Sequence, residues 1–173
     1  MNAAPILMAH SQCLEIASRV LFAEARFLDR QEWKEWLALY VEEAVYWIPA
    51  WKNEYETTSD PDRELSMIYH TSSVALAERI ARIQSRKSIT AMPLPRTVHC
   101  YSNLAAASAA PDAIEGDGCV TVHVFDPRTA RQHLNFGRFD YRLNRTGDRW
   151  QFAFKKIVLF NDRVNTLLDF YSI

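Results

Sequence analysis

The stretch of residues 132–159, QHLNFGRFDYRLNRTGDRWQFAFKKIVL, decides the fold predicted for this chain of 173 residues. Residues 132–143 and 149–159 are rich in aromatic and β-branched side chains, as long strands are. The loop between them, Arg145-Thr146-Gly147-Asp148, contains a glycine that can adopt a positive φ angle without strain. The stretch therefore predicts a long β-hairpin near the end of the chain.

The residues before this hairpin extend the predicted sheet. Residues 119–125 alternate valine with other side chains, which is the period of a half-buried strand. Residues 97–105 predict a further strand. Residues 105–118 begin with small side chains and continue with proline and glycine, so we expect a turn-rich connection there.

The first forty residues predict two helices. Residues 11–28 place leucine and alanine at spacings of three and four, with charged residues, Glu24 among them, at the other positions. Asp29 and Glu32 form a capping-box pattern that predicts the start of a second helix. One face of that helix would carry Trp33, Trp36, Leu37 and Tyr40.

The middle of the chain combines strand, loop and helix signals. Residues 44–48 and 65–70 predict short strands, and residues 52–64 predict a long polar surface loop. A third helix follows, capped by Ser72 or Ser73.

Helices followed by strands predict the α+β class. We expect a cone-shaped fold, in which a curved antiparallel or mixed sheet packs around the N-terminal helices. For a chain of this length, surface scaling implies that about 70% of the unfolded surface becomes buried. That core is large enough for a single domain spanning residues 1–173.

Charge and cysteine content exclude several classes of protein. The formal net charge is −1, so we predict binding neither to nucleic acid nor to an anionic membrane. No stretch approaches the roughly 18 apolar residues of a membrane span, and the N-terminus lacks the pattern of a signal peptide. The three cysteines form no close pair, which favours a reducing, cytoplasmic location.

The sequence lacks the spacings that make metal and nucleophile motifs specific. A Rieske cluster needs two short Cys-x-His-like pairs, but Cys100 directly follows His99 and no histidine lies within two residues of Cys119. The five histidines form no His-x₂-His or His-x₃-His pair. No nucleophile elbow or glycine-rich nucleotide loop is present. We therefore predict no catalytic, cofactor-binding or metal-binding residue in this chain.

An acid–base pair inside the cone is an open alternative, because a cavity can bring distant groups together. Its possible members are His99, His123, Tyr40 and Asp140. Ordinary polar groups of the core and the surface are the simpler interpretation of the same residues.

Aromatic residues divide into core and interface candidates. Trp33, Trp36 and Trp47 are expected in the core, because large aromatic side chains at helical or strand spacing usually pack there. Trp51 follows Pro49 and opens the polar loop, so it is an interface candidate.

Two other segments are also interface candidates. Arg79, Arg82 and Arg86 form a row on the third helix, where they would face solvent or pair with carboxylates of a partner. The apolar C-terminal tail, which includes Phe170 and Tyr171, should pack on the chain's own sheet or on another subunit.

Eight segments, taken in order, carry a resemblance to one family. They are LFAEARFLD at 21–29, EWKEWLALY at 32–40, VYWIPAW at 45–51, RELSMIY at 63–69, LAERI at 76–80, TAMP at 90–93, RTVH at 96–99 and KKIVL at 155–159. Together they resemble the small (β) subunits of Rieske-type aromatic-ring-hydroxylating dioxygenases. Segments 47–51 and 92–93 are most similar to the benzoate, anthranilate and halobenzoate group.

The resemblance implies a fold like that of nuclear transport factor 2 and ketosteroid isomerase. It implies an α₃β₃ assembly in which the small subunits associate into a trimeric base. The large subunit would hold a [2Fe-2S] Rieske cluster and a mononuclear Fe(II), and electrons from NADH would reach it through a reductase, with or without a ferredoxin. The small subunit would hold no metal, cofactor or catalytic residue.

Two functions follow from these observations. In the first, the chain is a non-catalytic structural subunit of a dioxygenase that adds both atoms of O₂ to an aromatic carboxylate such as benzoate or anthranilate. In the second, it is a free-standing isomerase, dehydratase or small-molecule-binding protein on the same fold. The apolar tail and the eight segments favour the first.

Overall fold

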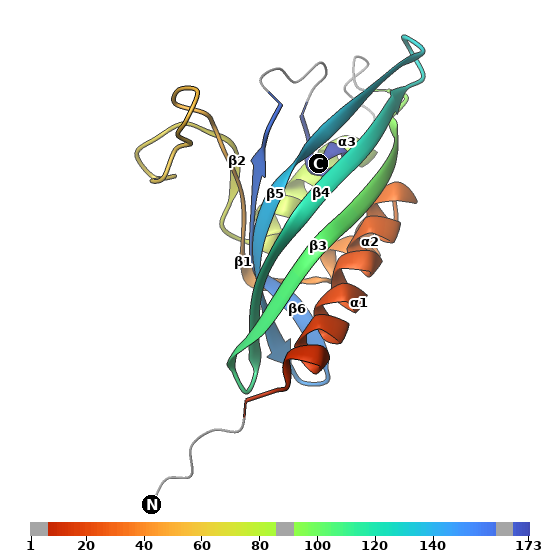
Figure 1. The fold of residues 1–173 in the computed structure, drawn as a ribbon. Coiled ribbons are helices and arrows are strands. Elements are labelled where there is room, and N and C mark those ends of the chain that lie inside the picture. Colours follow the sequence, from red (N-terminus) through yellow and green to blue (C-terminus); the bar gives the residue numbers. More distant parts are fainter. Residues whose placement is uncertain (1–6, 86–91, 162–167) are drawn as a thin grey trace, which may run out of the picture.

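The computed structural model describes residues 7–85, 92–161 and 168–173, which form one curved sheet with helices gathered along it (Figure 1). The sheet has six strands in the order β2-β1-β6-β5-β4-β3, with β1 and β6 parallel and the other neighbours antiparallel. In chain order the elements are α1 (His10–Asp29), α2 (Trp33–Leu37), β1 (Tyr40–Pro49), β2 (Ser66–His70), α3 (Ser73–Gln84), β3 (Arg96–Ala110), β4 (Ala113–Asp126), β5 (Arg131–Thr146), β6 (Arg149–Leu159) and the 3₁₀ helix η2 (Phe170–Ser172). This arrangement confirms the α+β class and the mixed sheet.

The hairpin predicted for residues 132–159 is confirmed. Strands β5 and β6 pair from Gly137 opposite Leu159 to Thr146 opposite Arg149, and Gly147 in the turn has a φ of 61°. The valines of residues 119–125 all face the core from β4, with exposures of 0–1%. Strand period and turn chemistry therefore predicted this half of the sheet.

The prediction of a turn-rich connection at residues 105–118 is wrong. Strand β3 continues to Ala110, β4 begins at Ala113, and only two residues connect them. The small side chains allow close packing instead: a Cβ on Gly116 would lie 2.0 Å from the carbonyl oxygen of Ala105. Glycine within a strand often marks such a close approach rather than a loop.

The second predicted helix is much shorter than its aromatic pattern suggested. Helix α2 ends at Leu37, and Tyr40 already belongs to β1, where it pairs with Phe152 of β6. Trp36 and Tyr40 still pack together, with ring centroids 5.2 Å apart. The aromatic stripe was correctly assigned to the core, but burial alone did not distinguish a helix from a turn leading into a strand.

Asp29 does not cap α2, contrary to the capping-box prediction. It is the last residue of α1, and Gln31 ends that helix in the left-handed region with a φ of 56°. The Glu32 amide then donates to the carbonyl oxygen of Phe27, as in a Schellman ending. The side chain of Asp29 is therefore free to reach β3.

The predictions for the middle of the chain are confirmed. Helix α3 is capped by Ser72, whose side chain accepts a hydrogen bond of 3.3 Å from the Ala75 amide. The loop 52–64 lies on the surface, and the Glu64 carboxylate fastens it by accepting hydrogen bonds from the amides of Ser59 and Asp60. This loop extends from the edge of the sheet formed by β1 and β2 (Figure 1).

The C-terminal segment closes the core between the helices and the sheet. Phe170 stacks on Trp36 with ring centroids 4.4 Å apart and an interplanar angle of 11°, and it meets Trp33 edge-on at 5.6 Å. Asn135 of β5 donates a hydrogen bond of 2.7 Å to the carbonyl oxygen of Ser172. Of the two partners predicted for the apolar tail, the chain's own core is the one it packs against.

Candidate functional site

Four polar side chains meet inside the cone and form what we call the interior polar cluster. Glu24 of α1 makes an ion pair with Lys155 of β6, and each side chain is 1% exposed. Tyr40 donates a hydrogen bond to Glu24 Oε1, and Tyr101 donates one of 2.8 Å to Glu24 Oε2. The Lys155 ammonium also donates to the Tyr101 hydroxyl at 2.9 Å. Every member of the cluster thus has a partner within it.

The surroundings of the cluster shift the pKa values of its members: burial lowers the pKa of Lys155, although the charge of Glu24 acts in the opposite direction. Burial by itself raises the pKa of Glu24, but the charge of Lys155 and the hydrogen bonds to the carboxylate lower this pKa below its usual value. The Lys155 nitrogen lies 4.9–5.6 Å from the centroids of three aromatic rings, a cation–π arrangement. Burial and the charge of Glu24 raise the pKa of the two tyrosines, so their hydroxyls stay protonated donors.

This cluster was not predicted from the sequence. Glu24 was expected among the charged residues outside the apolar face of the first helix, and that expectation was wrong, because Glu24 is fully buried. A signal was present: Glu24 lies three residues after Leu21 and four before Leu28, both of which are buried. A carboxylate at such a position needs a buried cation, since an unpaired charge in the core is very costly.

A second polar pair joins the end of α1 to β3. His99 Nδ1 lies 2.6 Å from Asp29 Oδ1, and the His99 amide and the Thr97 hydroxyl also donate to this carboxylate. The His99 side chain is 0% exposed, and its Nε2 atom has no hydrogen-bond partner. This pair has the composition of an acid–base dyad.

The other suggested acid–base residues do not join it. Tyr40 belongs to the interior polar cluster. His123 and Asp140 are exposed, on β4 and β5, and they pair across strands with Leu134 and Asp117 rather than with each other. The structure therefore does not bring the four candidates together: His99 pairs with Asp29, and Tyr40 pairs with Glu24.

The predicted interface residues have different environments. Trp51 is 38% exposed, and its indole nitrogen donates a hydrogen bond of 2.7 Å to the carbonyl oxygen of Leu159. Phe170 and Tyr171 are buried in the chain's own core, at 1% and 5% exposure. They consequently have almost no surface to offer a partner, whereas Trp51 does.

The arginines of α3 do not form one row facing outward. Arg79 makes a bidentate ion pair with Asp169, with nitrogen–oxygen distances of 2.9–3.1 Å, and so fastens the C-terminal segment. Arg82 is exposed, and Arg86 lies outside the described residues. Of the three, Arg79 has an intramolecular role that the sequence did not reveal.

The outer face of the sheet exposes an aromatic group, which we call the outer aromatic cluster: Trp51, Phe136 and Phe160. Phe136 and Phe160 meet edge-on with ring centroids 6.4 Å apart, and they are 43% and 39% exposed. Trp51 and Phe160 line one hollow of the surface. Contiguous exposed aromatic side chains of this kind are typical of a surface that a partner covers.

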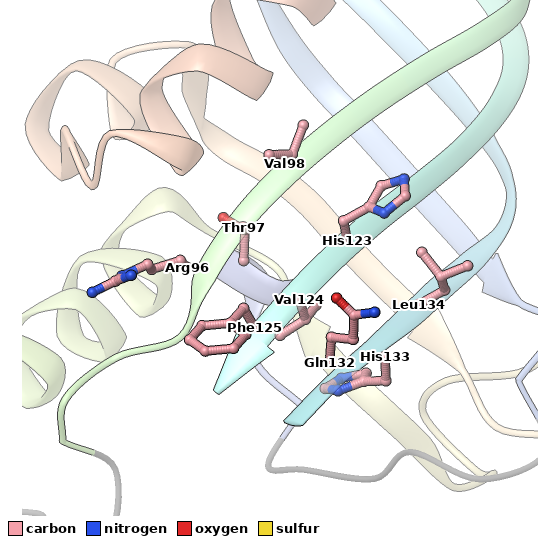
Figure 2. A pocket seen from close by; sticks show the side chains of 9 residues that line it. All are labelled: Arg96, Thr97, Val98, His123, Val124, Phe125, Gln132, His133 and Leu134. Atoms are coloured by element: carbon pink, nitrogen blue, oxygen red, sulfur yellow. The ribbon is translucent and has the colours of Figure 1, made fainter. Parts of the chain in front are cut away.

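A pocket of about 500 Å³ lies at one end of three neighbouring strands, and we call it the β3–β5 pocket (Figure 2). Its lining consists of residues 96–98, 123–125 and 132–134. The Arg96 guanidinium carbon lies 5.8 Å from the centroid of the Phe125 ring. His133 Nε2 is buried without a hydrogen-bond partner, and burial lowers the pKa of His133. The pocket thus combines apolar walls with cationic and hydrogen-bonding groups, and none of its described lining residues is acidic.

Among the described residues, no group of three or more histidine, cysteine, aspartate and glutamate side chains is placed to hold a metal ion. No helix in the described part of the chain is long and apolar enough to cross a membrane.

Comparison with known proteins gives a consistent result. Residues 23–166 match the family described as ring hydroxylating beta subunit. The chain is 32% identical to benzoate 1,2-dioxygenase subunit beta of Acinetobacter baylyi, over 100% of both chains. It is also 32% identical to the 2-halobenzoate 1,2-dioxygenase small subunit of Burkholderia cepacia, over 88% of this chain and 92% of that one.

Solved structures confirm the expected fold. The beta subunit of benzoate 1,2-dioxygenase from Burkholderia mallei superposes with a TM-score of 0.76 at 28% identity, covering 92% of this chain and 97% of that one. An NTF2-like protein from Novosphingobium aromaticivorans gives a TM-score of 0.61 at 11% identity, covering 88% and 85%. The second likeness concerns the fold alone, which is the nuclear transport factor 2 fold implied by the resemblance.

Proposed function

The chain belongs to the family of ring-hydroxylating beta subunits, the small subunits of aromatic-ring dioxygenases, and we propose that it is a non-catalytic structural subunit of such an enzyme. Its relatives are components of 1,2-dioxygenases, which are oxidoreductase complexes. The proposal adds the role of this subunit, its assembly and the class of substrate.

The interior polar cluster is the observation that carries the structural role. In this fold a ligand cavity would lie between α1 and the sheet, where Glu24, Lys155 and the two tyrosines satisfy one another. Polar groups saturated in this way offer little to a substrate, and a broken buried pair is strongly destabilising. The side chains of the interior polar cluster therefore hold α1 against β1, β3 and β6.

The outer aromatic cluster supports the role as a subunit, because it exposes Trp51, Phe136 and Phe160 side by side. We propose an α₃β₃ assembly with a base of three small subunits. The large subunit would hold the [2Fe-2S] Rieske cluster and the mononuclear Fe(II), and a reductase, with or without a ferredoxin, would deliver electrons from NADH to it. The unpaired state of Cys13, Cys100 and Cys119 supports a cytoplasmic location.

The proposed substrate is an aromatic carboxylate such as benzoate or anthranilate, converted by addition of both atoms of O₂. The names of the relatives, which act on benzoate and 2-halobenzoate, support this class. Dihydroxylation would occur entirely at the metals of the large subunit.

The decisive experiment compares the mass and iron content of this chain purified alone and after co-expression with its large subunit. We expect an iron-free protein alone and a red, iron–sulfur-containing hexamer together. A stable chain that does not associate with the large subunit would overturn the proposal.

The Asp29–His99 pair favours the second candidate, an isomerase or dehydratase with an acid–base dyad. Replacement of His99 by glutamine, which keeps an N–H group near Asp29, separates the two functions. A structural pair leaves the turnover of an intact dioxygenase complex unchanged. Loss of turnover in a complex of normal mass and iron content would show that His99 takes part in chemistry.

A further inference from the structure

We propose that the tip of loop 52–64 of one copy inserts into the β3–β5 pocket of the next copy, so that small subunits meet head to tail. The tip is the segment Glu54-Tyr55-Glu56. Closure of this contact into a ring of three rests on the proposed function, whereas the contact itself rests on the residues of this chain.

The loop tip has the form of an insertion element. Tyr55 is 86% exposed, more than any other large hydrophobic side chain of the described residues. Its position is fixed, because Asn53 Oδ1 accepts hydrogen bonds from the amides of Tyr55 and Glu56 at 2.8 and 3.0 Å. The amide of Lys52 also donates to the Glu56 carbonyl oxygen at 2.8 Å. A loop backbone held in place in this way loses little entropy on binding.

The chemistry of the β3–β5 pocket complements that of the tip. Val98 and Leu134 are 54% and 45% exposed in the pocket, which gives Tyr55 an apolar seat. Arg96 supplies a cation, and the exposed His123 a hydrogen-bonding ring, for the flanking carboxylates of Glu54 and Glu56. Among the described residues, no acidic side chain lines the pocket to oppose those carboxylates. Complementary charge of this kind sets the register of an interface.

The position of the loop tip outside the pocket points to a second copy as the occupant. The strand order places β2 and β1, which the loop connects, at one edge of the sheet and β3 at the other. Figure 1 shows the loop projecting from one side of the molecule and the ends of β3 and β4 on the opposite side. Two different patches on opposite sides give a heterologous contact, which closes into a ring when the rotation between copies permits it.

The first test uses charge reversal and its rescue in the chain purified alone. Arg96→Glu, or Glu54→Lys combined with Glu56→Lys, should weaken self-association about tenfold or more in sedimentation experiments. All three substitutions in one chain restore opposite charges at every contact, so association should recover. Arg149→Glu, an exposed reversal at the far end of β6, serves as the matched control and should change nothing.

The second test traps the contact and also applies if the chain alone is monomeric. A variant carrying Tyr55→Cys and Leu134→Cys, oxidised within the co-expressed complex, should give dimers and trimers of this chain on a non-reducing gel. The single-cysteine variants should give none, which controls for the native cysteines. Absence of the ladder in an intact complex would overturn the inference, as would self-association that ignores the charge reversals.

The two proposals fail in different ways. If the large subunit binds the chain but no cross-link or charge effect is found, the contact between copies is wrong and the proposed function stands. If the copies cross-link but the large subunit does not bind, the proposed function is wrong and the contact stands.

Discussion

At the scale of single residues, the interior polar cluster joins α1 to the sheet through buried charges. Glu24 and Lys155 form an ion pair in an environment that would strongly disfavour either charge alone. Hydrogen bonds from Tyr40 and Tyr101 stabilise the carboxylate of the pair, and three aromatic rings surround the ammonium group.

Replacement of Lys155 by methionine tests this directly. We expect the free energy of unfolding to fall by about 3–5 kcal/mol, because Glu24 is left buried without its cation. The measurement is urea denaturation followed by fluorescence. The double variant Glu24→Gln with Lys155→Met should recover part of the loss.

The neighbouring lysine is the matched control. Lys156 is half-buried on the outer face, with its nitrogen 4.5 Å from the centroid of the Trp47 ring. Lys156→Met should cost no more than about 1 kcal/mol, the value of an exposed cation–π contact. Equal losses at the two positions would contradict the role assigned to the ion pair.

At the scale of elements, local chemistry settles where helices begin and end. The sequence left Ser72 and Ser73 as alternatives for the cap of α3, and the structure selects Ser72 because its hydroxyl accepts from the Ala75 amide. The end of α1 depends instead on a left-handed Gln31, which the sequence did not signal.

The cap gives a prediction for α3. Ser72→Ala should destabilise the protein by about 1 kcal/mol, because an amide of the first turn loses its acceptor. In a chain of this size that corresponds to a fall in Tm of roughly 2–4 °C, measured by differential scanning calorimetry. Ser73→Ala, one residue into the helix, should leave Tm nearly unchanged. A larger fall in Tm for Ser73→Ala than for Ser72→Ala would show that Ser73, and not Ser72, caps the helix.

At the scale of the whole molecule, two similar aromatic residues have different tasks. Phe170 closes the core from the C-terminal segment at 1% exposure, whereas Phe160 belongs to the outer aromatic cluster at 39% exposure. The first stabilises this chain, and the second is available to a partner.

Alanine substitutions should separate these tasks. Phe170→Ala should lower the free energy of unfolding by about 3–5 kcal/mol, since it empties a site that Trp33 and Trp36 cannot fill. Phe160→Ala should change it by less than about 0.5 kcal/mol but reduce the yield of complex with the large subunit. Denaturation of the chain alone and co-purification with the large subunit measure the two effects. A Phe160 variant that is unstable alone would refute its assignment to the outer surface.

The sequence by itself determined the parts of this protein that follow a local period or a local turn. The β5–β6 hairpin, the buried valines of β4, the third helix and the core tryptophans were all predicted, because strands and helices repeat over a few residues. The ordered segments that resemble dioxygenase small subunits also predicted the family and the fold.

Only the tertiary structure decided which distant groups meet. Glu24 and Lys155 are 131 positions apart, and no local pattern reports that two charges will be desolvated together. The same holds for Asp29 with His99, for Arg79 with Asp169, and for the small residues that proved to be a strand rather than a loop. Local sequence sets which elements form, but the burial of a polar group depends on the partner that packing brings to it.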